Sequence, residues 1–561
     1  MTYDLLLKGA TIVDGTGRPQ YQADMGILAG KIIDIGQLDG GAARTLDLDG
    51  LVAAPGVVDV HTHYDAQVCW DGLLSSSAEH GTTTVVTGNC GIGVAPCRPQ
   101  HRDIALQDLV VLEGMSFEVM NTGIDWCFET FPQYLEYLQK RGLGINVNPL
   151  MPLSTLRRYT MGEEASERGA TEAERTEMAV NLRQAMEAGV AGFSATLVRR
   201  QVGHQGKPLA CALADMDELT AYAHVLRDLG RGTIQVNVME KLATLEDHEA
   251  EILELLLRES GRTVTYSGAL YRGDDPDAVE RMLQKAEPLR VRGAIPQTTI
   301  RPITIEVDFR NPFVFADVQA FKEVLNRPVD EQKRIYADAD WRARAVAELK
   351  EGGKIFGAAW EGSVVHRTNS ESLLPLLHRS VQVIAKERDK PPFDVMIDLA
   401  LEDNLEIKLL GDLVNTNPDH LRKHITDPRI LIGLADGGAH VDMLFEAGFP
   451  TYMLGHWVRE EQALTIEEAV RRMTSEPADY FGLHDRGRLE AGKAADLMIF
   501  DPDRVGSAEK ATELRNDLPA GGARLYAGAE GMEYVIVNGT VLYENGEHTG
   551  AMPGQIVNDA G

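Results

Sequence analysis

Residues 55–63 read Pro55-Gly56-Val57-Val58-Asp59-Val60-His61-Thr62-His63, so that a Pro-Gly turn leads into a short apolar run and then into two histidines. Such a run is typical of a buried strand. Side chains at positions i and i+2 of an extended backbone point to the same side, so the imidazoles of His61 and His63 are expected to project together. The pair could be two buried or surface histidines, but at a strand end it favours metal binding.

Seven further apolar runs of this kind follow, and helical patterns separate them. They are Thr83–Thr87, Ile145–Asn148, Ala191–Ala195, Thr233–Asn237, Thr263–Ser267, Ala294–Gln297 and Leu431–Asp436. With Val57–Val60 the chain has eight such runs. Alternating strands and helices predict a parallel sheet wrapped by helices. Eight strands fit an α/β fold, the TIM (β/α)8 barrel, whose active site lies where the strands end. We therefore expect residues 55–487 to form such a barrel.

The two ends of the chain carry a different pattern. The first 50 residues alternate short β-rich runs with glycine turns, and a matching pattern returns only in the last part of the chain. We expect residues 1–54 and 488–561 to form together one small β-sandwich domain. Residues 301–429 are too many for one loop, so they are expected to form an insertion before the last barrel strand.

Composition and charge exclude several classes of function. Lys and Arg total 55 and Asp and Glu total 85 in 561 residues, and the resulting net charge of −30 disfavours nucleic acid as a partner. The sequence contains no apolar stretch of about 18 residues, so it predicts no membrane span. An acidic Asp4 stands where a secretory signal would be basic, and the five cysteines do not indicate a disulfide framework. We expect a soluble, cytoplasmic protein without a membrane partner.

Two more residues with metal-binding or acid–base chemistry follow predicted strands. Cys90 lies in the glycine-flanked turn after the second strand, and Asp436 follows the eighth. Thiolate is a strong zinc ligand, so we favour metal binding over simple burial for Cys90. A carboxylate at this position could contact both a metal and a water molecule, as a general base requires, although an aspartate before two glycines is also common in turns.

In this order and spacing, the motifs resemble those of the amidohydrolase superfamily, and specifically of the N-acyl-D-amino-acid deacylase (D-aminoacylase) family. The resemblance runs nearly end to end and includes residues 55–63, 81–84, 88–91, 436–440, 487–497 and 537–539. It implies a TIM barrel with a β-sandwich from both termini, and zinc-dependent hydrolysis of the amide C–N bond of an N-acyl-D-amino acid or a similar amide.

The resemblance also implies roles for individual residues. The family's metal ligands are matched by His61, His63, Cys90 and Asp436. Asp436 also matches the family's general acid/base. In this mechanism a metal-activated hydroxide attacks the acyl carbonyl, and the acid/base transfers the proton. The family's second metal position takes histidines from strands five and six. Neither is present, since Gln235 or Asn237 and Gly268 stand near these places. We therefore expect one zinc ion per chain.

The absence of these two histidines leaves more than one function open. The first is a mononuclear amidohydrolase, which we favour because three ligand types persist on three separate strands. A cyclic amide or a carbamate could be hydrolysed at the same site. The remaining alternative is a catalytically inactive amidohydrolase-like binding protein.

Two residues are candidates for substrate binding. An N-acyl amino acid carries a carboxylate, and Arg301, after the seventh predicted strand, could bind it. The alternative is an arginine that caps the loop. His440, four residues beyond Asp436, is expected to bind substrate or to hydrogen-bond a ligand. The expected partner is a small-molecule amide, and the sequence leaves open whether the chain forms a homo-oligomer.

Overall fold

The computed structural model describes residues 2–558 except 200, 316, 317, 326, 351–359, 361, 442–444 and 509–511. Two parallel sheets form its centre, with strand orders β17-β13-β12-β11-β10-β9 and β6-β7-β8. Their strands are β6 (Val57–Asp59), β7 (Thr82–Thr87), β8 (Asn146–Pro149), β9 (Met151–Pro152), β10 (Gly192–Thr196), β11 (Thr233–Asn237), β12 (Val264–Ser267), β13 (Ala294–Thr298) and β17 (Leu431–Ile432). Each of the eight predicted runs overlaps one of these strands.

Backbone hydrogen bonds connect the two parallel sheets on both sides. On one side the amide of Leu150, between β8 and β9, donates to the carbonyl of Thr87 over 2.9 Å. On the other side the amide of Asp436, beyond β17, donates to the carbonyl of His61, beyond β6, over 3.0 Å. The segments that follow the first and last strands therefore lie side by side.

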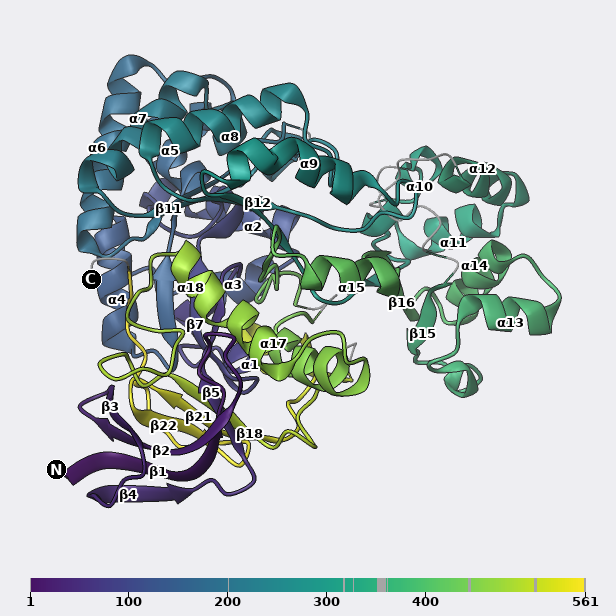
Figure 1. Cartoon of the computed structure of the whole chain (residues 1–561). Helices are drawn as coiled ribbons and strands as arrows, with labels where there is room; N and C mark the ends of the chain where they lie inside the picture. Colours follow the sequence, from purple (N-terminus) through teal and green to yellow (C-terminus); the bar gives the residue numbers. More distant parts are fainter. Residues whose placement is uncertain are drawn as a thin grey trace.

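Helices pack outside these sheets, mostly at the top of the view in Figure 1. In α8, for example, Leu253, Leu256 and Leu257 are buried, while Asp247 and His248 at its start are exposed, as expected for an amphipathic helix on a core. The outer helices are α4 (Phe131–Arg141), α5 (Leu153–Met161), α6 (Glu172–Ala188), α7 (Met216–Leu229), α8 (Asp247–Ser260), α9 (Ala278–Arg290), α17 (Ile466–Met473) and α18 (Ser475–Tyr480).

Both ends of the chain contribute to one nine-stranded sheet. Figure 1 shows its N-terminal strands in purple beside its C-terminal strands in yellow. The link is β5, which pairs with β1 in parallel and with β18 in antiparallel orientation. The strands are β1 (Thr2–Ile12), β2 (Tyr21–Leu28), β3 (Lys31–Gly36), β4 (Gly41–Asp47), β5 (Val52–Pro55), β18 (Leu497–Phe500), β21 (Met532–Val537), β22 (Thr540–Glu544) and β23 (Glu547–His548). The α/β class predicted from the sequence is confirmed.

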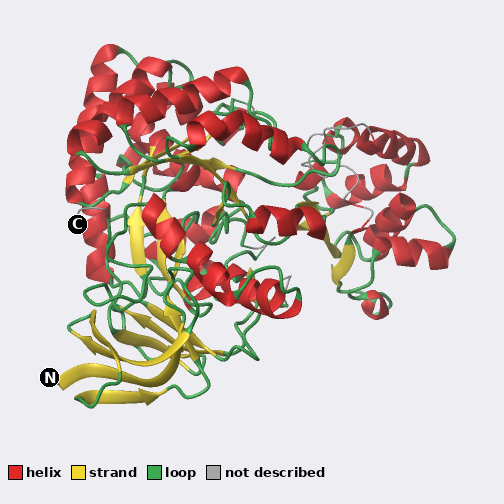
Figure 2. Cartoon of the chain, viewed as in Figure 1, coloured by secondary structure: helices red, strands yellow, loops and turns green. Residues whose placement is uncertain are grey.

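A separate packed unit lies between β13 and β17 in sequence and projects to one side of the molecule (Figures 1 and 2). Its antiparallel sheet consists of β14 (Ile303–Asp308), β15 (Val364–Arg367) and β16 (Lys408–Val414). Its helices are α10 (Gln319–Lys322), α11 (Val329–Ala337), α12 (Ala339–Lys350), α13 (Val381–Arg388) and α14 (Pro392–Glu402). The next helix, α15 (Pro418–Thr426), returns to the main body, where its Leu421 and Ile425 belong to the main core. Phe321, Tyr336, Trp341 and Phe393 belong to a hydrophobic core of its own.

The loops after β6 and β7 carry three further helices. They are α1 (Ser75–Ala78), α2 (Arg102–Glu113) and α3 (Phe117–Gly123). The described elements also include α16 (Phe449–Tyr452), the π-helix Met453–Glu460, and the strand pair β19 (Glu513–Arg515) and β20 (Arg524–Tyr526). Within the described part of the chain, no helix combines the length and apolar character that crossing a bilayer requires.

Candidate active site

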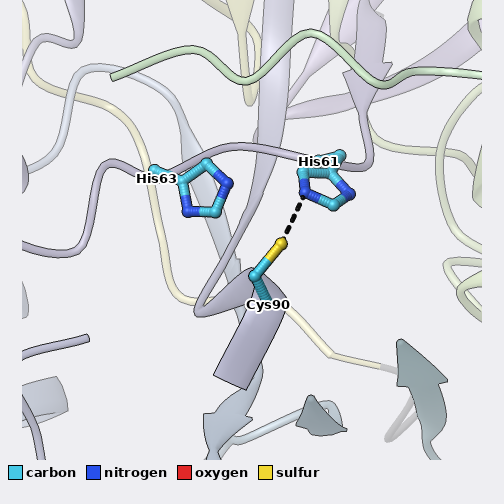
Figure 3. A group of neighbouring side chains, drawn as sticks. All are labelled: His61, His63 and Cys90. Atoms are coloured by element: carbon cyan, nitrogen blue, oxygen red, sulfur yellow. Dashed lines mark hydrogen bonds between the residues drawn. The ribbon is translucent and has the colours of Figure 1, made fainter. Parts of the chain in front are cut away.

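His61 and His63 lie directly beyond β6 and are almost completely buried. Their ring centroids are 5.3 Å apart, and the Sγ of Cys90 lies 3.3 Å from the Nε2 of His61 (Figure 3). One ligand atom from each of the three residues lies within 4.8 Å of the others. The structure therefore brings together three of the four predicted metal ligands around one point.

Asp436 supplies the fourth. Its Oδ1 lies 3.3 Å from the Nε2 of His61 and 3.4 Å from the Nε2 of His63. The residue has a positive φ of 46°, and its backbone is hydrogen-bonded to the segment beyond β6. The following Gly438 has a φ of 92°, and a Cβ there would lie 2.7 Å from the ring of Tyr64. The sharp turn after β17 thus requires a glycine and directs the carboxylate toward the two imidazoles.

The turn after β7 presents the thiol of Cys90. Cys90 itself has a φ of 57°, and Gly88 and Gly91 on either side have φ values of 78° and 75°. The amide of Cys90 donates to Gln235 Oε1 over 2.7 Å, which fixes the turn against β11. The side chain of Asn89 donates to two backbone carbonyls, one of them beyond β6. This turn is therefore held by both parallel sheets.

The charges of these groups depend on one another. Burial acts to raise the pKa of Cys90, but the charges and hydrogen bonds of His61 and His63 outweigh it and lower the pKa to about 6. Burial likewise opposes ionisation of Asp436, but the two imidazoles hold its pKa below the usual value. A thiolate, a carboxylate and two imidazoles form a donor set that zinc binds in tetrahedral geometry, so these residues fit the expected metal.

His440 lies beside this group. Its backbone amide donates to the carbonyl of Glu113 over 2.5 Å, and its side chain is partly buried. Burial lowers the pKa of its imidazole, while the charges of Glu113 and Asp436 act to raise it. The structure thus brings His440 to the candidate site.

Arg301 lies in a different environment from the one expected. Its side chain is fully buried, and its Nε donates to Glu446 Oε2 over 2.7 Å. The guanidinium also donates to the carbonyl of Phe445. Arg301 was expected to bind the carboxylate of the substrate. The structure corrects this expectation, because the buried guanidinium forms an ion pair and backbone hydrogen bonds that hold the loop after β13 in place.

Three further polar residues lie beside the candidate ligands. Gln297 Oε1, on β13, lies 2.6 Å from His61 Nδ1, and Asn237 Nδ2, on β11, donates to Cys90 Sγ over 3.2 Å. Glu113 Oε1, on α2, lies 3.5 Å from His63 Nδ1. A search for polar residues at strand ends could have singled out Gln297. Glu113 belongs to a helix, and nothing in its local sequence indicates a site.

Comparisons with known proteins agree with this arrangement. The model of the amidohydrolase family matches residues 44–543. The D-aminoacylase of Alcaligenes xylosoxydans xylosoxydans is 28% identical over 99% of this chain and 97% of that protein, and the N-acyl-D-glutamate deacylase of the same organism is 27% identical over 96% and 93%.

The crystal structure of N-acyl-D-glutamate deacylase from Bordetella bronchiseptica, complexed with zinc and a phosphonate inhibitor, has a similar fold. The TM-score is 0.66 at 23% identity, over 100% of both chains. The resemblance of the motifs is thereby confirmed. With a family match over most of its length, this chain belongs to the amidohydrolase family, whose members are metal-dependent hydrolases of non-peptide C–N bonds.

Proposed function

We propose that this protein is a zinc-dependent deacylase that hydrolyses the amide bond of N-acyl-D-amino acids. The observation that carries the proposal is the convergence of His61, His63 and Cys90, whose ligand atoms lie within 4.8 Å of one another, with Asp436 beside both imidazoles. The relatives named D-aminoacylase and N-acyl-D-glutamate deacylase, which match nearly the whole chain, support this choice of substrate.

The proposal includes a closed barrel. We infer that the two parallel sheets form one TIM barrel, with the site at the ends of its strands. The hydrogen bonds that connect the sheets beyond β7 and beyond β6 support this inference. We further infer that residues 1–54 and 488–561 form the accompanying β-domain, and that residues 301–429 are an insertion into the barrel.

The bound zinc would polarise the acyl carbonyl and make water more acidic. The carboxylate of Asp436 is ionised at neutral pH because the neighbouring imidazoles lower its pKa. It can therefore accept a proton from the attacking water and deliver it to the nitrogen as the C–N bond breaks. The products are the carboxylic acid of the acyl group and the free amino acid.

We propose one zinc ion per chain. On the side of β11, the Sγ of Cys90 already accepts a hydrogen bond from Asn237. Asn237 in turn accepts a hydrogen bond from Ser267 on β12 and donates one to Thr196 on β10. Amides and hydroxyls that satisfy one another here offer no imidazole to a second zinc ion, which supports a mononuclear site.

A substrate panel tests the proposed function. Purified, zinc-loaded protein is assayed with N-acetyl-D-amino acids, their L-enantiomers, a hydantoin and a carbamate, with a His61→Ala, His63→Ala double variant as the control. We expect hydrolysis of the D-enantiomers by the wild type alone. Turnover of only the hydantoin or the carbamate would replace the substrate class, and no turnover at all would favour a binding protein.

A further inference from the structure

The two imidazoles differ in what faces their second ring nitrogen. The Nδ1 of His61 lies 2.6 Å from the amide oxygen of Gln297. The Nδ1 of His63 is buried and has no hydrogen-bond partner among the described residues. A carboxylate oxygen of Glu113 lies 3.5 Å from it, just beyond a normal hydrogen bond. Buried polar atoms normally have a hydrogen-bond partner, so an unpartnered imidazole nitrogen beside a carboxylate is unusual and points to a role for that carboxylate.

The fold holds Glu113 in this place from two directions. Glu113 is the last residue of α2, and Gly114, with a φ of 64°, ends the helix in the left-handed conformation. The amide of His440, from the loop beyond β17, donates to the carbonyl of Glu113 over 2.5 Å. Five residues earlier on the same helix, Asp108 pairs with Arg158 in α5 over 2.8 Å, and both side chains are buried. The backbone of Glu113 is therefore tied to the same loop that carries Asp436.

Glu113 and Asp436 face opposite edges of one ring. Glu113 lies on the Nδ1 side of His63, and Asp436 lies 3.4 Å from Nε2. A metal ion bound through Nε2 among Cys90, His61 and Asp436 is therefore on the far side of the ring from Glu113. This placement argues against Glu113 as a ligand of the same ion and favours a role that acts through His63.

We propose that Glu113 is a positioning residue that accepts the Nδ1–H of His63 and leaves Nε2 as the nitrogen that binds the metal. The inference rests on the proposed function of this site. A carboxylate behind a metal-binding histidine fixes its tautomer and ring orientation and makes it a stronger donor. Gln297 holds His61 in the same way but through a neutral amide, so His63 is the more basic of the two imidazole ligands.

The test measures metal affinity rather than catalysis. Zinc is removed from the full-length protein, and zinc affinity is determined by competition with a chromophoric chelator for the wild type, E113A and E113Q. The ligand-field bands of bound Co²⁺ are recorded in parallel. We expect E113A to weaken zinc binding about 10–100-fold and to shift the Co²⁺ bands. E113Q should recover part of the affinity, because its amide oxygen can accept the same N–H, as that of Gln297 does.

Asp108→Asn is the matched control, since it removes another buried carboxylate from α2. It should lower the melting temperature through the lost pair with Arg158 and leave zinc affinity unchanged. If E113A binds zinc as tightly as the wild type, or if Asp108→Asn loses as much zinc affinity as E113A, the proposed role of Glu113 is overturned. Neither result would contradict the proposed function. If E113A does not fold, unchanged affinity and unchanged Co²⁺ bands in E113Q would overturn the role of Glu113 instead. Failure of the wild type to bind zinc would overturn both proposals.

Discussion

Replacing Asp436 with asparagine keeps the size of the side chain and removes its ability to accept a proton. Asp436 Oδ1 lies 3.3 and 3.4 Å from the two imidazole Nε2 atoms, which places the carboxylate at the proposed metal site, where the proposed reaction moves a proton. General acid–base groups contribute about 100- to 10,000-fold to rate. The substitution should therefore lower kcat by this factor, or about 2.7–5.4 kcal/mol of transition-state stabilisation at about 1.36 kcal/mol for each factor of ten.

The assay follows release of the free amino acid from an N-acetyl-D-amino acid at saturating zinc, and metal content is measured on the same samples. The imidazoles hold the pKa of Asp436 below its usual value. As the pH is lowered, wild-type kcat should therefore begin to fall only at a pH below the ordinary pKa range of a carboxyl group. The variant should lose this acidic limb. A zinc-loaded Asp436→Asn enzyme that retains more than about a tenth of wild-type kcat would refute the assignment, since general acid–base groups contribute at least about 100-fold.

Three further predictions concern buried groups. In the metal-free chain, alkylation of Cys90 should rise with pH around a midpoint near 6, because the imidazoles lower its pKa to about 6, and zinc should protect it; a midpoint near 9 in mass-spectrometric labelling would contradict this. Burial raises the pKa of Asp59 to about 8, so the folded state retains a proton that the unfolded state releases. Denaturant titrations should therefore show stability falling more steeply between about pH 4 and pH 8 in the wild type than in Asp59→Asn, and equal slopes would contradict this. Arg301→Ala should cost about 3–5 kcal/mol of folding stability, because it removes the buried ion pair between Arg301 and Glu446. A selective rise in KM for a carboxylate substrate in a fully stable variant would restore the original expectation.

The strands could be predicted because short apolar runs recur between amphipathic helices. Thr233–Asn237 was predicted and is observed as β11 with the same bounds. The last strand was predicted to reach Asp436, but β17 ends at Ile432, because Gly433 has a φ of 137° and the chain turns toward the site. The apolar pattern continues through this turn, so periodicity alone could not place the strand end.

The candidate metal ligands could be singled out from the sequence because each lies a few residues beyond a strand and has a characteristic chemistry. His61, His63, Cys90 and Asp436 meet as the strand order requires. Arg301 also follows a strand, yet its guanidinium turns to Glu446, a residue 145 positions away in sequence. Glu113 reaches the site from a helix end. Contacts of this kind depend on tertiary packing, and no local pattern in the chain specifies them.

Metal content per chain tests the proposed site most directly. Protein purified without added metal, and again after supply of zinc and removal of the excess, is analysed by elemental mass spectrometry alongside the His61→Ala, His63→Ala double variant. A single site at His61, His63, Cys90 and Asp436 predicts about one zinc ion per chain in the wild type and none in the variant. Two ions per chain would contradict the mononuclear site, and the absence of bound zinc even after its supply would contradict the metal centre itself.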